Sequence, residues 1–501
     1  MRMKLLALIS LLLLVQASNL AAKEKGSKLL AKISLQDQLD EFKSSLFEDG
    51  SHPEVNDGAT LDFDSFVQIV KVNHPDIVSA HISRDIAKSK RIEAQGAFDP
   101  SINSQDFFHR FNSSSDVGQS QEAFSSNTSL DFLTGYGAKF GLGARFAQGD
   151  IKTPISPTGD AGEYFVKAQI PLLRNAIYNS SSVKEKTAKL KEVIADYKLF
   201  LIQLKTLDSS IKAYWNWAAN KRILDVETDL LNLVNGQVSF VEDQASLGNI
   251  ARISIVEAER EVQKRQSKVN LALRLFQQSS LDLSQYIWSQ EGTPYAIPSE
   301  KQVPKDLPVP EALNKDQVNE AKLNALELRP EFKALGLSRD ISDLERKLAR
   351  NQMLPQLDAY ISSGIETGGD SIGPGYEAGF NISLPLRVRK AKGQKQQAEF
   401  KIKQLNLEER KLIQAVFLEI EDSASAVDTA YQRYLAAKQE YELSRQLEEG
   451  EEERFKLGDS TLFLVIRRQR ATVAANVELI KTIADYHKAR IRFRLVQGQL
   501  V

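Results

Sequence analysis

Two pairs of prolines with the same spacing are the feature that most constrains how this chain can fold. Pro75 and Pro330 lie 255 positions apart. Pro100 and Pro355 lie the same distance apart. Proline is tolerated in the first turn of a helix and stops a helix that precedes it, so each interval predicts one helix of about 20 residues. The chain is therefore expected to contain two tandem repeats.

The same order of landmarks continues after these prolines. The tetrapeptide SRDI occurs in both helical intervals, IPLLR at Pro171 matches LPLRV at Pro385, and Leu-Gly pairs follow at 247–248 and 457–458. The offset falls from 255 to 214 and then to 210, so the first repeat has 41 extra residues before Pro171. Four more extra residues, about one helical turn, lie in the segment that follows.

Alternating apolar and polar residues predict strands in both repeats. In the second repeat, Tyr376, Ala378, Phe380 and Ile382 alternate with polar residues and glycine. The first repeat shows this pattern at Tyr136–Phe146 and again from Tyr164 to Ile170. Strands with one apolar and one polar face are typical of transmembrane barrels, and also of a half-exposed sheet in a soluble sandwich. Both interpretations stay open at this level.

Two long intervals predict coiled-coil-like helices. Residues 180–246 contain no proline and a single glycine, and apolar residues keep three-and-four spacing there and in the counterpart at 391–456. Each helix would be about 100 Å long, and its charges exclude lipid along its length. A Leu-Gly turn and a returning helix, 250–287 or 460–497, are expected to follow each one.

The N-terminus predicts a secretory signal. Arg2 and Lys4 precede a predominantly apolar run at 5–15, which is too short for a spanning helix, and cleavage is expected after Ala17 or Ala22. An N-terminal anchor is the alternative. The chain has no cysteine, which excludes disulfides and lipidation on a thiol. Its 65 basic and 66 acidic residues give no charge excess that would indicate nucleic acid.

These landmarks predict the following domain division. It comprises a signal peptide (1–22), an N-terminal segment with a short helix (23–74), repeat 1 (75–288, strands within 101–173, tip at 247–249), a proline-rich linker with a short equatorial helix (289–329), and repeat 2 (330–501, strands within 355–387, tip at 457–459). Two or three strands per repeat cannot close a barrel alone, so several copies of the chain are expected to share one.

The ordered landmarks resemble those of the TolC-like outer-membrane efflux proteins of Gram-negative bacteria. The similarity covers nearly all of the mature chain and is carried by NHPDI and LRPEF, PLLR and PLRV, and the tips SLGNIARISIVEAERE and KLGDSTLFLVIRRQR. The resemblance implies a mainly α fold with a transmembrane β part. It implies a homotrimer in which each chain gives about four strands to a shared 12-stranded outer-membrane β-barrel and four helical columns to a periplasmic α-barrel.

The resemblance also implies a function and partners. The chain would be the outer-membrane channel of a tripartite efflux or type I secretion system, a passive gated duct in contact with outer-membrane lipid. Its partners would be a periplasmic adaptor (membrane fusion) protein and an inner-membrane RND or ABC-type pump. A periplasmic coiled-coil scaffold without a channel is the main alternative, and a soluble pore-forming toxin is a third. The sequence names neither the substrate nor a particular adaptor or pump.

Three groups of candidate residues follow. The adaptor-docking tips are Leu247, Gly248, Asn249, Leu457, Gly458 and Asp459; the candidate pore-gating residues are Asp459, Leu464, Arg467 and Arg468; the barrel residues expected to face lipid are Tyr136, Phe140, Phe146, Tyr164, Tyr376 and Phe380. Trp and Phe side chains are expected to anchor the barrel in the membrane.

The chain departs from the family pattern in two places. Some relatives carry aspartates six and nine residues after the second tip glycine, where Leu464 and Arg467 stand here. The 41 extra residues are expected to lengthen the barrel on its outer side rather than to add strands, because long loops face outward in such barrels. The run EEGEEER at 448–454 is interpreted as a solvated helical face, or as a partner of Arg467 and Arg468.

Enzymatic chemistry is not predicted. The sequence has no Walker loop and no nucleophile elbow, and the histidines show no metal-ligand spacing. Ser181 and Lys184 form an S-x-x-K pattern at a helix start, where capping by serine is the simpler interpretation. No catalytic residue, cofactor or metal is expected.

Overall fold

The computed structural model describes residues 60–112, 120–149, 157–159, 161–367 and 374–500. The expected signal peptide and most of the segment before residue 75 lie outside these ranges. The first repeat contains α3 (Phe63–Asn73), α4 (Pro75–Gln95), the 3-10 turn η1 (Gly96–Phe98), β1 (Ser101–Asn112), β2 (Ser120–Leu133), β3 (Lys139–Gly149), β4 (Glu163–Pro171), α5 (Ser180–Ser246) and α6 (Ile253–Ser284).

The second half of the chain follows the same order with fewer strands. It contains η2 (Glu300–Gln302), α7 (Lys315–Leu328), α8 (Pro330–Asn351), β5 (Gln356–Glu366), β6 (Gly375–Ser383), α9 (Arg389–Lys456) and α10 (Leu462–Val496).

The paired prolines begin the two short helices, as the sequence predicts. Pro75 and Pro330 stand in the first turn of α4 and α8, where the missing N–H costs no helical hydrogen bond. The His74 ring caps α4 by accepting a hydrogen bond at Nδ1 from the backbone N–H of Asp76 (3.2 Å). Asn179 caps α5 by accepting at Oδ1 from the N–H of Ser182 (2.8 Å).

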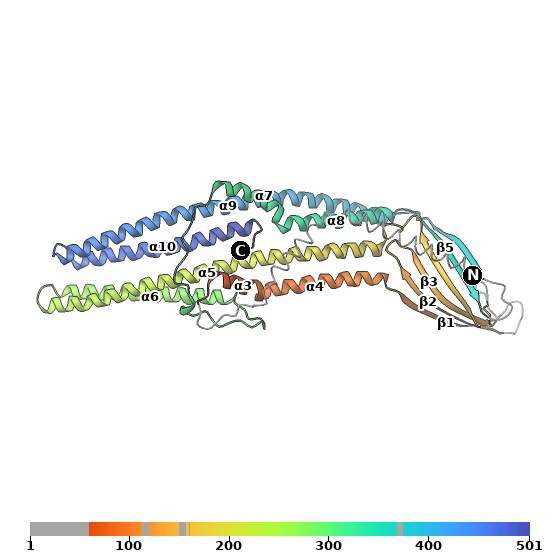
Figure 1. The fold of residues 1–501 in the computed structure, drawn as a ribbon, viewed down its shortest axis with the longest axis horizontal. Coiled ribbons are helices and arrows are strands. Elements are labelled where there is room, and N and C mark those ends of the chain that lie inside the picture. The colour runs from red at the N-terminus through yellow and green to blue at the C-terminus, as the bar shows by residue number, and fades with distance from the viewer. Residues whose placement is uncertain (1–59, 113–119, 150–156, 160, 368–373, 501) are drawn as a thin grey trace, which may run out of the picture. The chain divides into compact units, whose positions relative to one another are not determined.

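The long helices α5 and α9 have 67 and 68 residues and organise the other helices around them (Figure 1). Each packs against its own short helix, α4 or α8, and against its returning helix, α6 or α10. The contacts of α5 with α8 and with α10 join the two repeats. The sheet lies at one end of α4, α5, α8 and α9, and the α5–α6 and α9–α10 turns lie at the opposite end (Figure 1).

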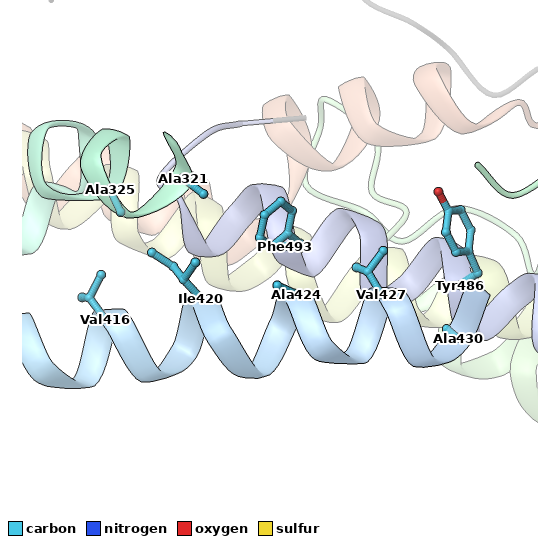
Figure 2. Packing of buried hydrophobic residues seen from close by; sticks show 9 residues of the cluster. All are labelled: Ala321, Ala325, Val416, Ile420, Ala424, Val427, Ala430, Tyr486 and Phe493. Carbon is cyan, nitrogen blue, oxygen red and sulfur yellow. The ribbon is translucent and has the colours of Figure 1, made fainter. Parts of the chain in front are cut away.

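A buried apolar cluster holds the equatorial helix α7 against the second repeat (Figure 2). Ala321 and Ala325 of α7 lie over the α9 stripe that includes Val416 and Ile420, and Phe493 of α10 closes the same cluster. Small alanine side chains let α7 approach α9 closely, and Phe493 and Tyr486 of α10 complete the cluster.

The tryptophans belong to the helical part of the protein. Trp215 and Trp217 are buried on α5, where Trp215 stacks on Phe63 of α3, and Trp288 follows α6. The expectation that tryptophan anchors the strands in a membrane is therefore wrong, because all three tryptophans of the chain lie outside the sheet. Phenylalanines do occur on β1, β2, β3, β4 and β6.

The described strands form one antiparallel sheet in the order β1-β2-β3-β4-β5-β6. Pairing of β4 with β5 joins the two repeats, with Glu163 opposite Glu366 and Pro171 opposite Asp358. The expected number of about four strands is therefore wrong: the first repeat supplies four and the second supplies two. The extra residues of the first repeat add strands rather than lengthening existing ones.

None of the described helices is both long enough and apolar enough to cross a membrane.

Candidate functional sites: the helical tips and the two-faced sheet

Both tips are closed by the same hydrogen-bonded motif. Gly248 and Gly458 have φ of 80° and 79°, in the left-handed region that favours glycine. At the first tip, the N–H of Gly248 donates to Ala245 O (3.1 Å) and that of Asn249 to Gln244 O (3.0 Å). These two bonds form a Schellman motif.

The second tip repeats this motif residue by residue. The N–H of Gly458 donates to Phe455 O (3.0 Å), and the N–H of Asp459 donates to Arg454 O (2.9 Å). The two Leu-Gly turns are therefore equivalent structures, each made by its own local sequence.

Apolar side chains are exposed on these tips. Leu247 is 70% exposed and Leu457 is 84% exposed, and Phe463 beside them is also largely exposed. A cleft of about 350 Å³ separates the two hairpins here, with Phe240 and Phe455 on its walls in an edge-to-face contact (6.3 Å between ring centroids). Exposed leucines beside a cleft are features of a protein-docking surface.

Ion pairs and a hydrogen bond connect the second tip to α9 and α10. Arg454 reaches Asp459 (Nη2 to Oδ2, 3.3 Å), and Glu451 lies between Arg468 (Nε to Oε2, 3.4 Å) and Ser460, whose hydroxyl donates to Oε1 (2.5 Å). The Ser460 hydrogen bond, with help from the Arg468 charge, lowers the pKa of the Glu451 carboxyl.

The acidic run differs from a solvated face at three positions: Glu451 is buried, Glu448 and Glu452 are half-buried, and Glu452 accepts a hydrogen bond from the Gln469 amide (3.1 Å). Glu451 makes the pairing with Arg468 that the sequence offered as an alternative. Of the other candidate gating residues, Arg467 is exposed and Leu464 is half-buried, both on α10. Sequence periodicity places all of them near the tip but does not show which carboxylate is buried.

A second ionic cluster joins the two hairpins farther from the tips. Glu261 on α6 is buried and lies between Arg265 of the same helix (2.8 Å) and Arg470 of α10 (3.3 Å). Arg265 also approaches Glu227 of α5 (3.7 Å). Sequence reasoning missed this cluster, since Glu261 and Arg265 read locally as an ordinary i,i+4 surface pair.

The sheet has one mainly apolar face and one mainly polar face; the exceptions are Asp106, Arg110, Glu122 and Gln148 on the first and Phe107, Phe165 and Tyr360 on the second. Residues directly opposite each other in antiparallel strands share a face, so the register assigns every side chain. We define the apolar face by Ile102, Phe108, Phe124, Leu130, Phe132, Phe140, Leu142, Phe146, Tyr164, Val166, Ile170, Ile361, Ile365, Tyr376, Phe380 and Ile382, and the polar face by Asn103, Gln105, Asn127, Asp131, Lys139, Arg145, Glu163, Lys167, Gln169, Asp358, Glu377 and Asn381.

The apolar face is open to its surroundings in this single chain. Ile102 on β1 is 77% exposed, and Tyr376 and Phe380 on β6 are 76% and 73% exposed. Half-buried Phe140 stacks on Phe132 (5.5 Å between ring centroids), and half-buried Phe146 lies near Phe124 (6.4 Å). An exposed apolar surface of this extent marks a membrane or protein contact.

The polar face is cross-linked by charges and is hollowed. Arg145 pairs with Glu163 (2.7 Å), Lys167 with Asp131 (2.8 Å), and the Gln169 amide donates to Asp358 (2.7 Å). A depression of about 490 Å³ at the η1 end of the strands reaches from β1 to β5, so the polar face is hollowed at this end.

The residues expected to face lipid share the apolar face, with one exception. Phe140, Phe146, Tyr164, Tyr376 and Phe380 all lie on it. Tyr136 stands in the turn between β2 and β3, where the Thr134 hydroxyl and the backbone of Ala138 hydrogen-bond to each other. The period-two pattern includes Tyr136 because it does not detect the turn that ends β2.

No group of three or more His, Asp or Glu side chains in the described ranges is arranged to hold a metal ion.

At the S-x-x-K pattern, Ser181 lies in the first turn of α5, and the Lys184 ammonium pairs with Glu93 of α4 (3.4 Å). The surroundings of this lysine are those of a helix surface rather than of a nucleophile.

Paired helical hairpins that carry a two-faced antiparallel sheet at the end opposite their tips define a TolC-like architecture. The comparisons confirm the resemblance to TolC-like outer-membrane efflux proteins. Residues 323–499 match the model of the family described as "Outer membrane efflux protein". No curated protein matches the sequence.

Solved structures extend the similarity to most of the chain. The outer membrane protein VceC of Vibrio cholerae is 13% identical with a TM-score of 0.60, over 87% of this chain and 95% of that one. The Campylobacter jejuni CmeC outer membrane channel is 12% identical (TM-score 0.59, 91% of each chain). The Neisseria gonorrhoeae MtrE outer membrane channel is 13% identical (TM-score 0.60, 90% and 94%). At these identities the likeness establishes the fold.

Proposed function

We propose that this protein is the outer-membrane channel of a tripartite efflux or type I secretion system in a Gram-negative bacterium. The observation that carries the proposal is the sheet, whose apolar face is exposed while its polar face is charged and hollowed at one end. A sheet of this kind fits a barrel wall with lipid outside and water inside. A periplasmic scaffold without a channel would have no use for the exposed apolar face.

Closure of the barrel requires further copies of the chain. Within the described residues, β1 and β6 each have one unpaired edge, and an open edge in lipid leaves backbone polar groups unsatisfied. Three copies that pair β1 with a neighbour's β6 would remove every edge. In this proposal the trimer contains 18 strands, whereas the family resemblance implies 12.

The helices continue the duct into the periplasm. A helix of 67 residues is about 100 Å long, and the charged side chains of α5 and α9 suit water rather than lipid. The tips would then dock a periplasmic adaptor through Leu247 and Leu457, and the adaptor would couple the duct to an inner-membrane RND or ABC-type pump. The family match and the exposure of both leucines support this assignment.

The candidate gate lies at the same end. Arg468, held by buried Glu451, and Asp459, held by Arg454, would fix the tip in one position, while exposed Arg467 and half-buried Leu464 would line the narrowest part. Transport through such a duct is passive, so energy has to come from the pump.

Reconstitution into planar lipid bilayers tests the channel. Purified trimer should give discrete conductance steps, and Arg468→Ala, which frees the Glu451 contact, should raise the open probability. The exposed α9 variant Arg445→Ala, also within 15 residues of Gly458, serves as the matched control. If the trimers insert into the bilayer but neither the wild type nor Arg468→Ala shows a conductance step, the protein is not a channel and the scaffold interpretation is favoured.

A further inference from the structure

A groove of about 1140 Å³ lies along the helices next to the sheet. Residues of α4, α5 and α8 line it, and α9 contributes one side chain. The α5 residues in the lining form one continuous face, including Lys184, Lys191 and Ile202, rather than two separate edges. The groove therefore passes across α5 from α4 to α8.

We infer the concave side of the helical layer from this groove. α4 and α8 both pack against α5, which lies between them. A hollow that crosses α5 and reaches both α4 and α8 is expected on the side toward which this layer of three helices curves. In the trimer proposed above, the concave side of the helical wall faces the lumen.

Lysines dominate the charge of this groove. Lys184, Lys191 and Lys198 follow one another at seven-residue intervals on α5, so the row advances about 10 Å per step. Lys90 of α4 and Lys401 of α9 add to the same lining. Exposed Lys205 continues the seven-residue spacing beyond it.

Few carboxylates offset these charges. The groove lining includes Glu93, which pairs with Lys184 (3.4 Å), and Glu345 of α8. In the part of the chain that the structure describes, no carboxylate lies within ion-pair distance of Lys191 or Lys198, and both side chains are exposed. The lining therefore carries a net positive charge that is not neutralised locally.

We propose that this lysine row makes the helical part of the duct selective for anionic solutes over cations. The proposal rests on the proposed channel function, because only a lumen turns a groove charge into selectivity. Rings of Lys or Arg in a pore attract anions, and a trimer presents each lysine of the row three times. The effect should be strongest at low salt, since the screening length is about 10 Å at 0.1 M and about 3 Å at 1 M.

Reversal potentials of the reconstituted trimer in a KCl gradient measure this selectivity. The wild type should prefer Cl⁻ to K⁺ at low ionic strength, and the preference should shrink at high salt. The double variant Lys191→Glu with Lys198→Glu should shift the reversal potential toward K⁺. Lys191→Arg with Lys198→Arg keeps the charge and should retain the wild-type preference.

A control on the other side of the same helix separates lumen charge from total charge. Lys186 and Lys189 are exposed on α5, about 140° to 200° around the helix from Lys184, and are absent from the groove. Lys186→Glu with Lys189→Glu makes the same charge change and should leave the reversal potential unchanged. Equal shifts in both double variants, or no shift in either, would overturn the proposal while the conductance itself still supports the channel.

Discussion

His487 shows how one side chain reports on the packing between the two repeats. Its ring stacks on Trp215 of α5 (4.4 Å between ring centroids), and its Nε2 lies 2.7 Å from Pro308 O. A carbonyl only accepts, so Nε2 carries the proton and donates this bond in the neutral ring. Burial lowers the pKa of His487, which means that the folded protein favours the neutral form.

The pH dependence of stability follows from that shift. The unfolded chain takes up a proton on this histidine near its ordinary pKa of about 6.5, whereas the folded chain resists it. The contribution of His487 is therefore complete above about pH 6.5 and is lost as the pH falls below it. We expect thermal unfolding, followed by circular dichroism, to occur at a lower temperature at pH 5 than at pH 8.

The variant His487→Gln tests the assignment of this effect. A glutamine amide can still donate to Pro308 O but does not titrate, so the difference between the two pH values should become smaller. An unchanged difference would show that His487 is not responsible.

At the scale of elements, the long helices and the strands β3, β4 and β6 could be predicted closely, whereas β1 and β2 could not. The breaker-free interval at 180–246 coincides with α5, because Asn179 and Gly248 are local signals for a start and an end. β1 and β2 are rich in Ser, Asn and Gln, so their period-two pattern is weak, and only pairing with β3 reveals them as strands. The contact of Glu261 with Arg470 joins distant parts of the chain and leaves no local signal.

The tips provide a prediction about docking. Leu457→Asp should weaken co-purification of the periplasmic adaptor, because a carboxylate would replace an 84% exposed apolar contact. Leu418→Asp, on the same helix and about 58 Å from the tip, is the matched control. Single-channel conductance should be the same in both variants. Equal adaptor recovery with Leu457→Asp and wild type would exclude this docking surface.

The buried cluster between the hairpins provides a prediction about stability. Glu261→Gln removes the charge that compensates Arg265 and Arg470, and breaking a buried ion pair in this way costs about 3 kcal/mol. We expect faster amide hydrogen exchange in the turns of α6 and α10 that carry Glu261 and Arg470. Glu259→Gln changes an exposed residue on α6 and should have little effect. Unchanged exchange in Glu261→Gln would mean that the ionic cluster does not hold the hairpins together.

At the scale of the whole molecule, the additional hairpin would enlarge the trimer proposed above. The sequence offset located the 41 extra residues correctly but did not determine what they form. Their strands β1 and β2 pair with each other along their whole length, and β2 pairs with β3. Because the diameter of a barrel grows with its number of strands, a trimer of six-stranded sheets is wider than one of four-stranded sheets.

Deleting the hairpin tests this directly. Asp99 and Lys139 line the same depression, so removing residues 100–138 should let the end of η1 connect to β3 and leave a four-stranded sheet. Trimers should still form, because β3 then offers the edge that β1 offered. Their barrel diameter in electron micrographs should fall by about a third, in proportion to 12 strands instead of 18. Equal diameters would show that β1 and β2 lie outside the barrel wall, whereas loss of trimers would show that the edge of β1 is specifically required.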